Sequence, residues 1–262
     1  MKIVNAQISS TTNKETNLEK AIKAIKEAKK EEADLILFPE MYMFYTSING
    51  IVPKEVAEPL NGEFVKRLSE AAKEHKIYVV CGVHELDNIA NSVYNSVVTI
   101  NKSGELISSY RKTHLCDSWN VNESDLFKAG KKPFEIIETE FGKIGILICY
   151  ELRFPEISRY LTNENIDILL VPAAWYSGGY KEEHWIHLVK ARAIENTIFV
   201  CAVNQAQEPF CGRSTIIDPM GVMLSSAGKE EQLISGKIDV EYIKKVREVN
   251  PCLNNIVDGI YN

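Results

Sequence analysis

Short apolar runs of strand length alternate along the chain with amphipathic stretches at helical spacing, and this alternation restricts the fold more than any other feature. The runs are rich in Ile, Leu and Val, as strands buried on both faces of a sheet are. Strands are expected at 2–8, 34–38, 77–83, 144–149, 166–172 and 198–203. Helices are expected at 16–32, 63–75, from 155 onward and at 181–196. Repeated pairs of a buried strand and a helix predict a layered α/β domain.

Two segments interrupt this alternation with the signature of antiparallel hairpins. Residues 91–100 and 104–111 are joined by a polar turn, and a second hairpin is expected over 213–225. The sequence contains no linker, repeat or low-complexity tract, and its content of 45% hydrophobic and 25% charged residues is ordinary for a globular protein. We therefore expect one α/β domain with mixed sheets over 1–262, with a C-terminal tail from about residue 250.

Charge and cysteine content argue against several classes of function. A net charge of −6 without a basic stretch argues against a nucleic-acid partner. No apolar run approaches the roughly 20 residues that span a bilayer, and the N-terminus has the pattern of a strand, not of a signal peptide. None of the six cysteines forms a CxxC pair, so no metal site is indicated. We expect a cytoplasmic protein with free thiols and without metal, cofactor or membrane partner.

Reactive side chains stand at the ends of three expected strands, where functional groups gather in layered α/β proteins. Glu40 follows the apolar run 35–39, Lys112 ends the first hairpin, and Cys149 ends the apolar run before the helix at 155. Each has an ordinary alternative, as a buried structural thiol or as a solvated turn residue. A turn after Cys149 would expose its sulfur and offer backbone N–H groups to a developing oxyanion. Their combination therefore favours a nucleophilic site.

The residues around these three positions resemble the three motifs of the nitrilase, or carbon–nitrogen hydrolase, superfamily. The matching segments are LFPE at 37–40, YRKTHL at 110–115 and CYELRFPE at 149–156. Further segments that resemble the family are ESDLFKAG at 123–130, HWIHLVKARAIEN at 184–196 and GRSTIIDPMG at 212–221. The resemblance reaches from about residue 1 to about residue 245, and three motifs in order and at the right spacing make it specific.

The resemblance implies a four-layer α-β-β-α sandwich, a homodimer or higher homo-oligomer, and a Glu–Lys–Cys triad. Carried over position by position, Glu40 is the general base, Lys112 the cationic stabiliser and Cys149 the nucleophile. Glu123 matches a second glutamate that supports the lysine or positions substrate. The implied reaction is hydrolysis of a small amide through an acyl-thioester on Cys149, with the backbone N–H of Tyr150 and Lys112 holding the oxyanion.

Three side chains are further candidates for contact with the substrate. Arg153 either pairs with an acidic side chain such as Glu156 or clamps a substrate carboxylate in bidentate fashion. Relatives that act on ω-amides of dicarboxylic acids have a similarly placed arginine, so the resemblance favours a small amide that carries a carboxylate. Tyr42 and Trp175 follow strand ends and either pack in the core or line the pocket.

Three alternatives stay open. Hydrolysis of a nitrile or of an N-carbamoyl amine uses the same triad as amide hydrolysis. A Cys–His hydrolase on another fold would use His114, which can share a strand face with Lys112, or His187 in the expected helix 181–196. A binding protein without activity is the third alternative, because a fold alone does not prove catalysis.

Overall fold

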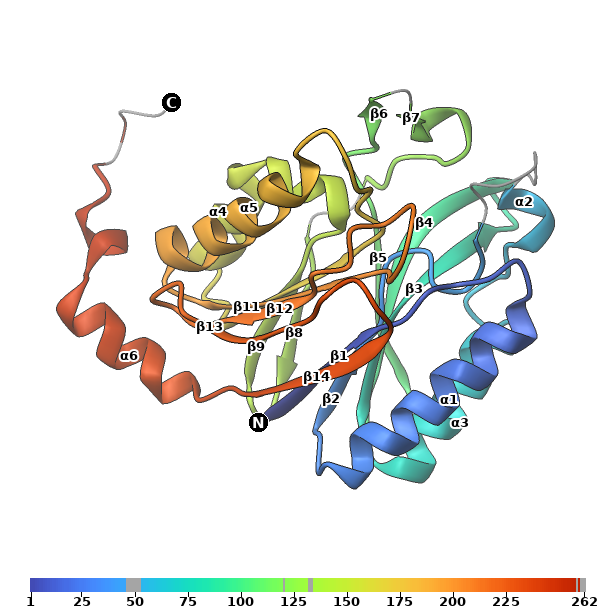
Figure 1. The fold of residues 1–262 in the computed structure, drawn as a ribbon, viewed down its shortest axis with the longest axis horizontal. Coiled ribbons are helices and arrows are strands. Elements are labelled where there is room, and N and C mark those ends of the chain that lie inside the picture. Colours follow the sequence, from blue (N-terminus) through green and yellow to red (C-terminus); the bar gives the residue numbers. More distant parts are fainter. Residues whose placement is uncertain (46–52, 120, 132–133, 258, 260–262) are drawn as a thin grey trace.

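The computed structural model describes residues 1–45, 53–119, 121–131, 134–257 and 259, and it places two six-stranded sheets between layers of helices (Figure 1). The first sheet contains, in spatial order, β14 (Gln232–Lys237), β1 (Lys2–Gln7), β2 (Leu35–Leu37), β3 (Tyr78–Asp87), β4 (Ser92–Ile100) and β5 (Leu106–Arg111). Strands β1, β2 and β3 run parallel, whereas β14, β4 and β5 join the sheet antiparallel. The β4–β5 pair is the first hairpin that the sequence predicts.

The second sheet repeats this plan with a parallel centre and antiparallel edges. Its spatial order is β13 (Met223–Ser226), β12 (Thr215–Ile217), β11 (Phe199–Asn204), β10 (Ile168–Ala173), β9 (Gly142–Ile146) and β8 (Ile136–Thr139). Strands β9, β10 and β11 are parallel, and the β12–β13 pair is the second expected hairpin. A small separate hairpin joins β6 (Asp117–Ser118) to β7 (Val121–Asn122).

Helices cover the outer face of each sheet, which completes an α-β-β-α sandwich with mixed sheets as expected (Figure 1). Helices α1 (Lys14–Lys30) and α3 (Glu63–His75) pack on the first sheet, and α4 (Pro155–Asn163) and α5 (Lys181–Asn196) pack on the second. One apolar core lies under α1 and α3, and a larger one fills the space between the sheets and under α4 and α5. No helix in these described ranges combines the length and the apolar character needed to cross a bilayer.

Local chemistry explains where the main helices begin. The side chain of Asn13 accepts a hydrogen bond from the backbone N–H of Thr16, which caps the first turn of α1. Helix α4 begins at Pro155, whose missing N–H is not needed in a first turn. A four-residue helix, α2 (Pro53–Val56), precedes α3.

The boundary near Cys149 differs from the expected one. The sequence predicts one strand over 144–149, but β9 ends at Ile146 and Cys149 begins a short 3₁₀ helix, η2 (Cys149–Arg153). Cys149 itself cannot belong to the strand, because its φ of +48° lies outside the extended region. The sequence does not reveal where the strand ends, because Leu147 and Ile148, which follow it, are apolar and fully buried like the residues of the strand.

Elements outside the expected set lie mostly at the edges of the sheets. They are β8, β14, the β6–β7 hairpin and α6 (Val240–Val249), which extends beyond the sandwich (Figure 1). The expected tail follows α6 and includes the 3₁₀ helix Cys252–Asn255. Positions 258 and 260–262 of that tail lie outside the described residues.

Candidate active site

The expected catalytic side chains meet between the two sheets, at the carboxyl ends of their strands. Glu40 comes soon after β2, Lys112 directly follows β5, and Cys149 comes soon after β9. The Lys112 Nζ lies 2.7 Å from Glu40 Oε1 and 2.8 Å from Glu123 Oε2, and Cys149 lines the same cavity as these three residues. All four side chains are buried. Residues far apart in sequence therefore form one compact group of a thiol, an ammonium and two carboxylates.

Backbone geometry directs two of these side chains into the group. The turn after β2 crosses strand β3 at Gly82, where an added Cβ would lie 2.4 Å from Pro39 O and 2.7 Å from the Cα of Glu40. Only glycine allows this close approach. The left-handed φ of Cys149 turns its side chain out of the strand direction and into the site, which is the kind of local strain that functional sites hold.

Burial and charge set the protonation states of the resting site. Burial alone would lower the pKa of Lys112, but the carboxylates of Glu123 and Glu40 raise it well above its usual range, so the ammonium stays charged. Burial raises the pKa of Cys149 well above its usual range, and the charge of Glu40 adds to the effect. The resting nucleophile is therefore a neutral thiol, and a base must take its proton as the sulfur attacks.

Asn95 on β4 connects the two carboxylates and was not among the sequence candidates. Its Nδ2 donates to Glu40 Oε1 and to Glu123 Oε1, each at 2.7 Å. Backbone donors fix the other oxygens: Ala174 N lies 2.8 Å from Glu40 Oε2, and Cys116 N lies 2.7 Å from Glu123 Oε2. An asparagine inside the apolar stretch SVYNSVV was the available sequence signal, because a buried strand accepts an amide only where it is hydrogen-bonded.

Glu151 ties the turn of the nucleophile to the segment that carries the lysine. Its side chain is fully buried and accepts hydrogen bonds from Ile148 N at 2.8 Å, Thr113 N at 2.8 Å and the Tyr110 hydroxyl at 2.7 Å. Two of these donors precede and follow Lys112 in the chain. Glu151 therefore holds two distant segments in register without lining the cavity.

A cavity of about 350 Å³ opens onto the reactive groups. Its walls combine the charged group with aromatic and apolar side chains, namely Glu40, Met41, Lys112, Cys116, Ser118, Trp119, Val121, Glu123, Leu126, Phe127, Cys149, Tyr150, Arg153, Ala174, Trp175, Tyr176 and Lys181. Tyr150 and Trp175 thus lie where the sequence predicts. This size and this mixture are typical of a site for a small molecule.

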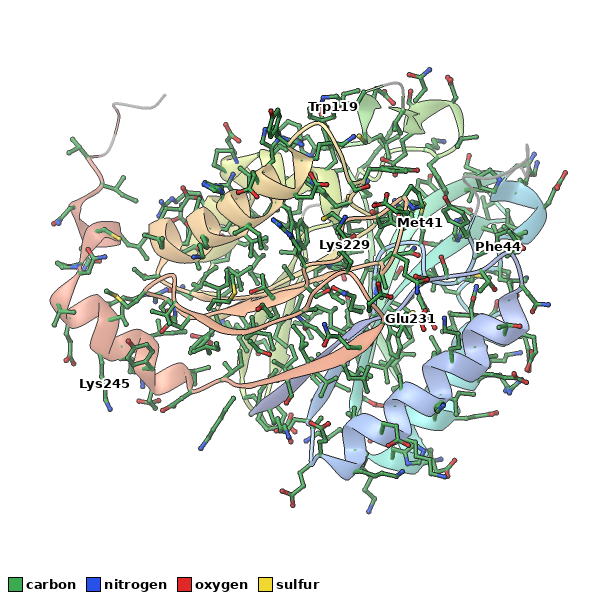
Figure 2. The ribbon with its side chains drawn as sticks, in the orientation of Figure 1. Met41, Phe44, Trp119, Lys229, Glu231 and Lys245 are labelled. Atoms are coloured by element: carbon green, nitrogen blue, oxygen red, sulfur yellow. The ribbon has the colours of Figure 1, made fainter. Side chains whose placement is uncertain are left out.

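Arg153 lies in the cavity wall between two indole rings. Its guanidinium carbon is 4.3 Å from the ring centre of Trp119 and 4.5 Å from that of Trp175. Figure 2 shows Trp119, which was not among the sequence candidates, beside the β6–β7 hairpin. Within the described part of the chain Arg153 forms no ion pair, so the alternative of a structural pairing with Glu156 is wrong. The guanidinium is held in place by stacking and stays available to an anion.

Tyr42 does not line the cavity, so its assignment as a substrate contact is wrong. Its side chain is fully buried, and its hydroxyl donates to Asn17 O at 3.1 Å. The ring packs 5.2 Å from that of Phe38. Met41, with a φ of +52°, reverses the direction of the chain, so that the residue after it turns into the core under α1.

The two histidines of the Cys–His alternative lie outside the site. His114 packs 4.4 Å from the ring of Phe154 and lies 3.7 Å from a carboxylate oxygen of Glu151. His187 lies on α5 and bonds to Glu183 O. No histidine of the described residues lines the cavity that contains Cys149. The geometry therefore contradicts a Cys–His pair.

Comparisons with known proteins agree with this geometry. The family model of carbon–nitrogen hydrolases matches residues 3–248. Deaminated glutathione amidase of Escherichia coli O157:H7 is 30% identical over 255 residues, which cover 97% of each chain. Omega-amidase NIT2 of Xenopus tropicalis is 33% identical over 260 residues, which cover 95% of this chain and 92% of the relative. The crystal structure of Saccharomyces cerevisiae Nit3, a member of branch 10 of the nitrilase superfamily, has a TM-score of 0.87 at 29% identity and covers 96% of this chain and 94% of its own.

Proposed function

The chain belongs to the carbon–nitrogen hydrolase family, and from that premise we propose that Glu40, Lys112 and Cys149 are its catalytic triad. It is an amidase, which cleaves a non-peptide C–N bond, and we propose that the cleavage proceeds through an acyl intermediate on Cys149. The observation that carries the triad is the meeting of a neutral thiol, a carboxylate and an ammonium in the wall of one cavity. Glu123 supports Lys112 as its second anionic partner.

The proposed reaction has two halves that use the same base. Cys149 Sγ attacks the amide carbonyl while Glu40 takes the thiol proton, and the carbonyl oxygen becomes an oxyanion near the Lys112 ammonium. The Tyr150 N–H lies in the first turn of η2, where backbone donors have no partner within the helix, and completes the oxyanion site. Glu40 then protonates the departing ammonia and leaves a thioester. Water that Glu40 deprotonates attacks the thioester carbonyl, the C–S bond breaks to release the carboxylic acid, and Glu40 returns the proton to the departing Cys149 sulfur.

We further propose that the substrate is a small ω-amide with a free carboxylate. Arg153 supplies a fixed planar cation with two parallel donors, which is the geometry that a carboxylate prefers. The cavity volume suits a substrate of a few carbons. The relative that is named omega-amidase points to amides of this class.

Release of ammonia from matched compounds tests this substrate class. We expect kcat/KM for succinamate to exceed that for butanamide, its neutral counterpart of equal length, by at least about tenfold. 3-Cyanopropanoate and N-carbamoyl-β-alanine test the nitrile and carbamoyl alternatives. Mass spectrometry of the intact protein should detect a succinyl adduct on Cys149 that is absent from Cys149→Ala. An active Cys149→Ala variant would contradict the triad, and equal rates for the two amides would contradict the substrate class.

We also propose a cytoplasmic homodimer. All six cysteines are free thiols, which fits a reducing compartment. Large apolar side chains are exposed on the edge strand of the second sheet and on its helices, namely Tyr160 on α4, Ile194 on α5, and Met223 and Leu224 on β13. Exposed apolar clusters of this kind mark protein–protein contacts. Sedimentation should give the mass of two chains for the wild type and of one for Ile194→Glu; a monomeric wild type would refute the dimer.

A further inference from the structure

A row of three polar side chains crosses the first sheet under the active site. His84 on β3 is directly opposite Asn95 on β4 in the antiparallel register, and Lys112 N donates to Asn95 O at 2.9 Å. Side chains directly opposite each other in an antiparallel pair project from the same face, with Cβ atoms about 5 Å apart. The imidazole of His84 is therefore a neighbour of the amide that connects Glu40 to Glu123.

The orientation of the Asn95 amide leaves its oxygen without a partner. Nδ2 donates to two carboxylate oxygens, and the reversed amide would place Oδ1 against both of them, so only one orientation is possible. Oδ1 then points away from the carboxylates. It is buried and accepts no hydrogen bond from the described residues. Buried amide oxygens are almost always hydrogen-bonded, so we expect a hydrogen-bond donor next to Asn95 Oδ1.

His84 has the complementary deficit. Its side chain is fully buried, and neither Nδ1 nor Nε2 has a hydrogen-bond partner within the described ranges. Burial lowers the pKa of His84 to about 3, so the ring is neutral near neutral pH and carries one N–H donor. The ring lies 5.7 Å from that of Phe127, which lines the catalytic cavity.

We propose that His84 is a positioning residue, whose ring N–H binds Oδ1 of Asn95 through one buried water and thereby holds the amide that orients Glu40 and Glu123. A neutral donor leaves the charge of the site unchanged. A hydrogen bond to Oδ1 also polarises the amide and strengthens its two N–H donors. The inference rests on the proposed triad, because positioning Glu40 matters for turnover only if Glu40 is the base.

Variants at position 84 test this role through kinetics. His84→Phe keeps a ring beside Phe127 but removes both nitrogens, and we expect kcat to fall about tenfold with KM unchanged, as for the weakening of one buried hydrogen bond. His84→Gln retains a donor and should recover kcat to within about threefold of the wild type. Thr99→Val is the matched control. It removes a buried hydroxyl on β4 that, like the His84 ring, has no partner among the described residues, and it should leave kcat unchanged. Full activity of His84→Phe would overturn the inference.

A coupling measurement separates positioning from general packing. In an Asn95→Ala background, His84→Phe should lower kcat no further, since the amide it acts through is gone. An equal loss in both backgrounds would overturn the inference. A measurement on the wild type tests the inference even if His84→Phe does not fold. NMR of the protein with ¹⁵N-labelled histidine observes only five residues. His84 should show one neutral tautomer and a ring N–H protected from exchange with water from pH 5 to 8.

The outcomes of that experiment also distinguish the two proposals. Asn95→Ala should remove the protection of the His84 N–H, whereas Cys149→Ala should preserve it. Titration of His84 between pH 5 and 8, or an N–H whose exchange Asn95→Ala leaves unchanged, would overturn the positioning role alone. Activity in Cys149→Ala would overturn the triad and leave the spectroscopic result standing.

Discussion

The substitution Glu123→Gln tests how Lys112 is held, because it removes one charge and changes few atoms. Glu123 accepts three hydrogen bonds, from Lys112 Nζ at 2.8 Å, Cys116 N at 2.7 Å and Asn95 Nδ2 at 2.7 Å. A glutamine has one oxygen and one NH₂ group, so at least one donor of this set must face another donor. With the oxygen toward Lys112 and Cys116, the buried Asn95 loses one acceptor.

The expected loss follows from that count. One charge-assisted hydrogen bond and one buried donor without an acceptor together cost about 2–4 kcal/mol. Lys112 also loses one of the two carboxylates that raise its pKa, and it keeps Glu40 as the other. If that free energy is lost in the transition state, where Lys112 faces the oxyanion, kcat falls by about 30- to 1,000-fold.

Ammonia release under saturating succinamate measures this effect, with thermal unfolding followed by circular dichroism to check the fold. Glu135→Gln is the matched control: its carboxylate accepts a bond from Ser108 at 2.7 Å outside the catalytic cavity, and we expect its kcat to be unchanged. If Glu123→Gln folds and turns over within about threefold of the wild type, then Glu123 does not support Lys112 and the reasoning is wrong.

Three further results are expected. Arg153→Met should lower kcat/KM for succinamate by about 10- to 100-fold and leave butanamide nearly unaffected, and an equal loss for both would refute the carboxylate clamp. His84 is buried with its pKa lowered to about 3, so its neutral form gives stability that is fully present above about pH 6.5 and lost as the pH falls toward 3, by about 1.4 kcal/mol per unit. The free energy of unfolding, measured with urea at pH 6.5 and 5.0, should fall with that slope in the wild type and with a smaller slope in His84→Phe. Equal slopes in the two proteins would contradict the lowered pKa of His84. Glu151→Gln should reduce the free energy of unfolding by about 2–4 kcal/mol, because its oxygens accept several buried donors, and an unchanged urea midpoint would contradict its tethering role.

Glu40, Lys112 and Cys149 could be singled out from the sequence because each stands near a strand end, where functional groups gather in layered α/β proteins, and because the residues around them resemble the family motifs. Hydrophobic periodicity located nearly all the helices and central strands, because burial of one helix face or of a whole strand requires apolar residues at regular positions in the sequence. Edge elements such as β8 and β14 leave a weaker trace, because polar residues interrupt their apolar positions.

Orientation was not accessible in that way. Tyr42 and Trp175 both follow strands, yet the backbone at Met41 turns Tyr42 into the core while Trp175 lines the cavity. Asn95 looks like an interruption of a strand until Glu40 and Glu123 lie on either side of its amide. Trp119 reaches Arg153 from a hairpin too short to give a periodic signal.

By itself, the sequence determined the α/β class, the order of the main elements and three candidates for the reactive residues, because hydrophobic periodicity and the chemistry of single side chains can be read from residue order. The tertiary structure decided which groups hold those residues in place: Asn95 between two carboxylates, Glu151 between two segments, and Arg153 between two indoles. Each of these contacts joins residues from separate elements. Their distances and directions exist only after both sheets have packed, so no window of sequence contains them.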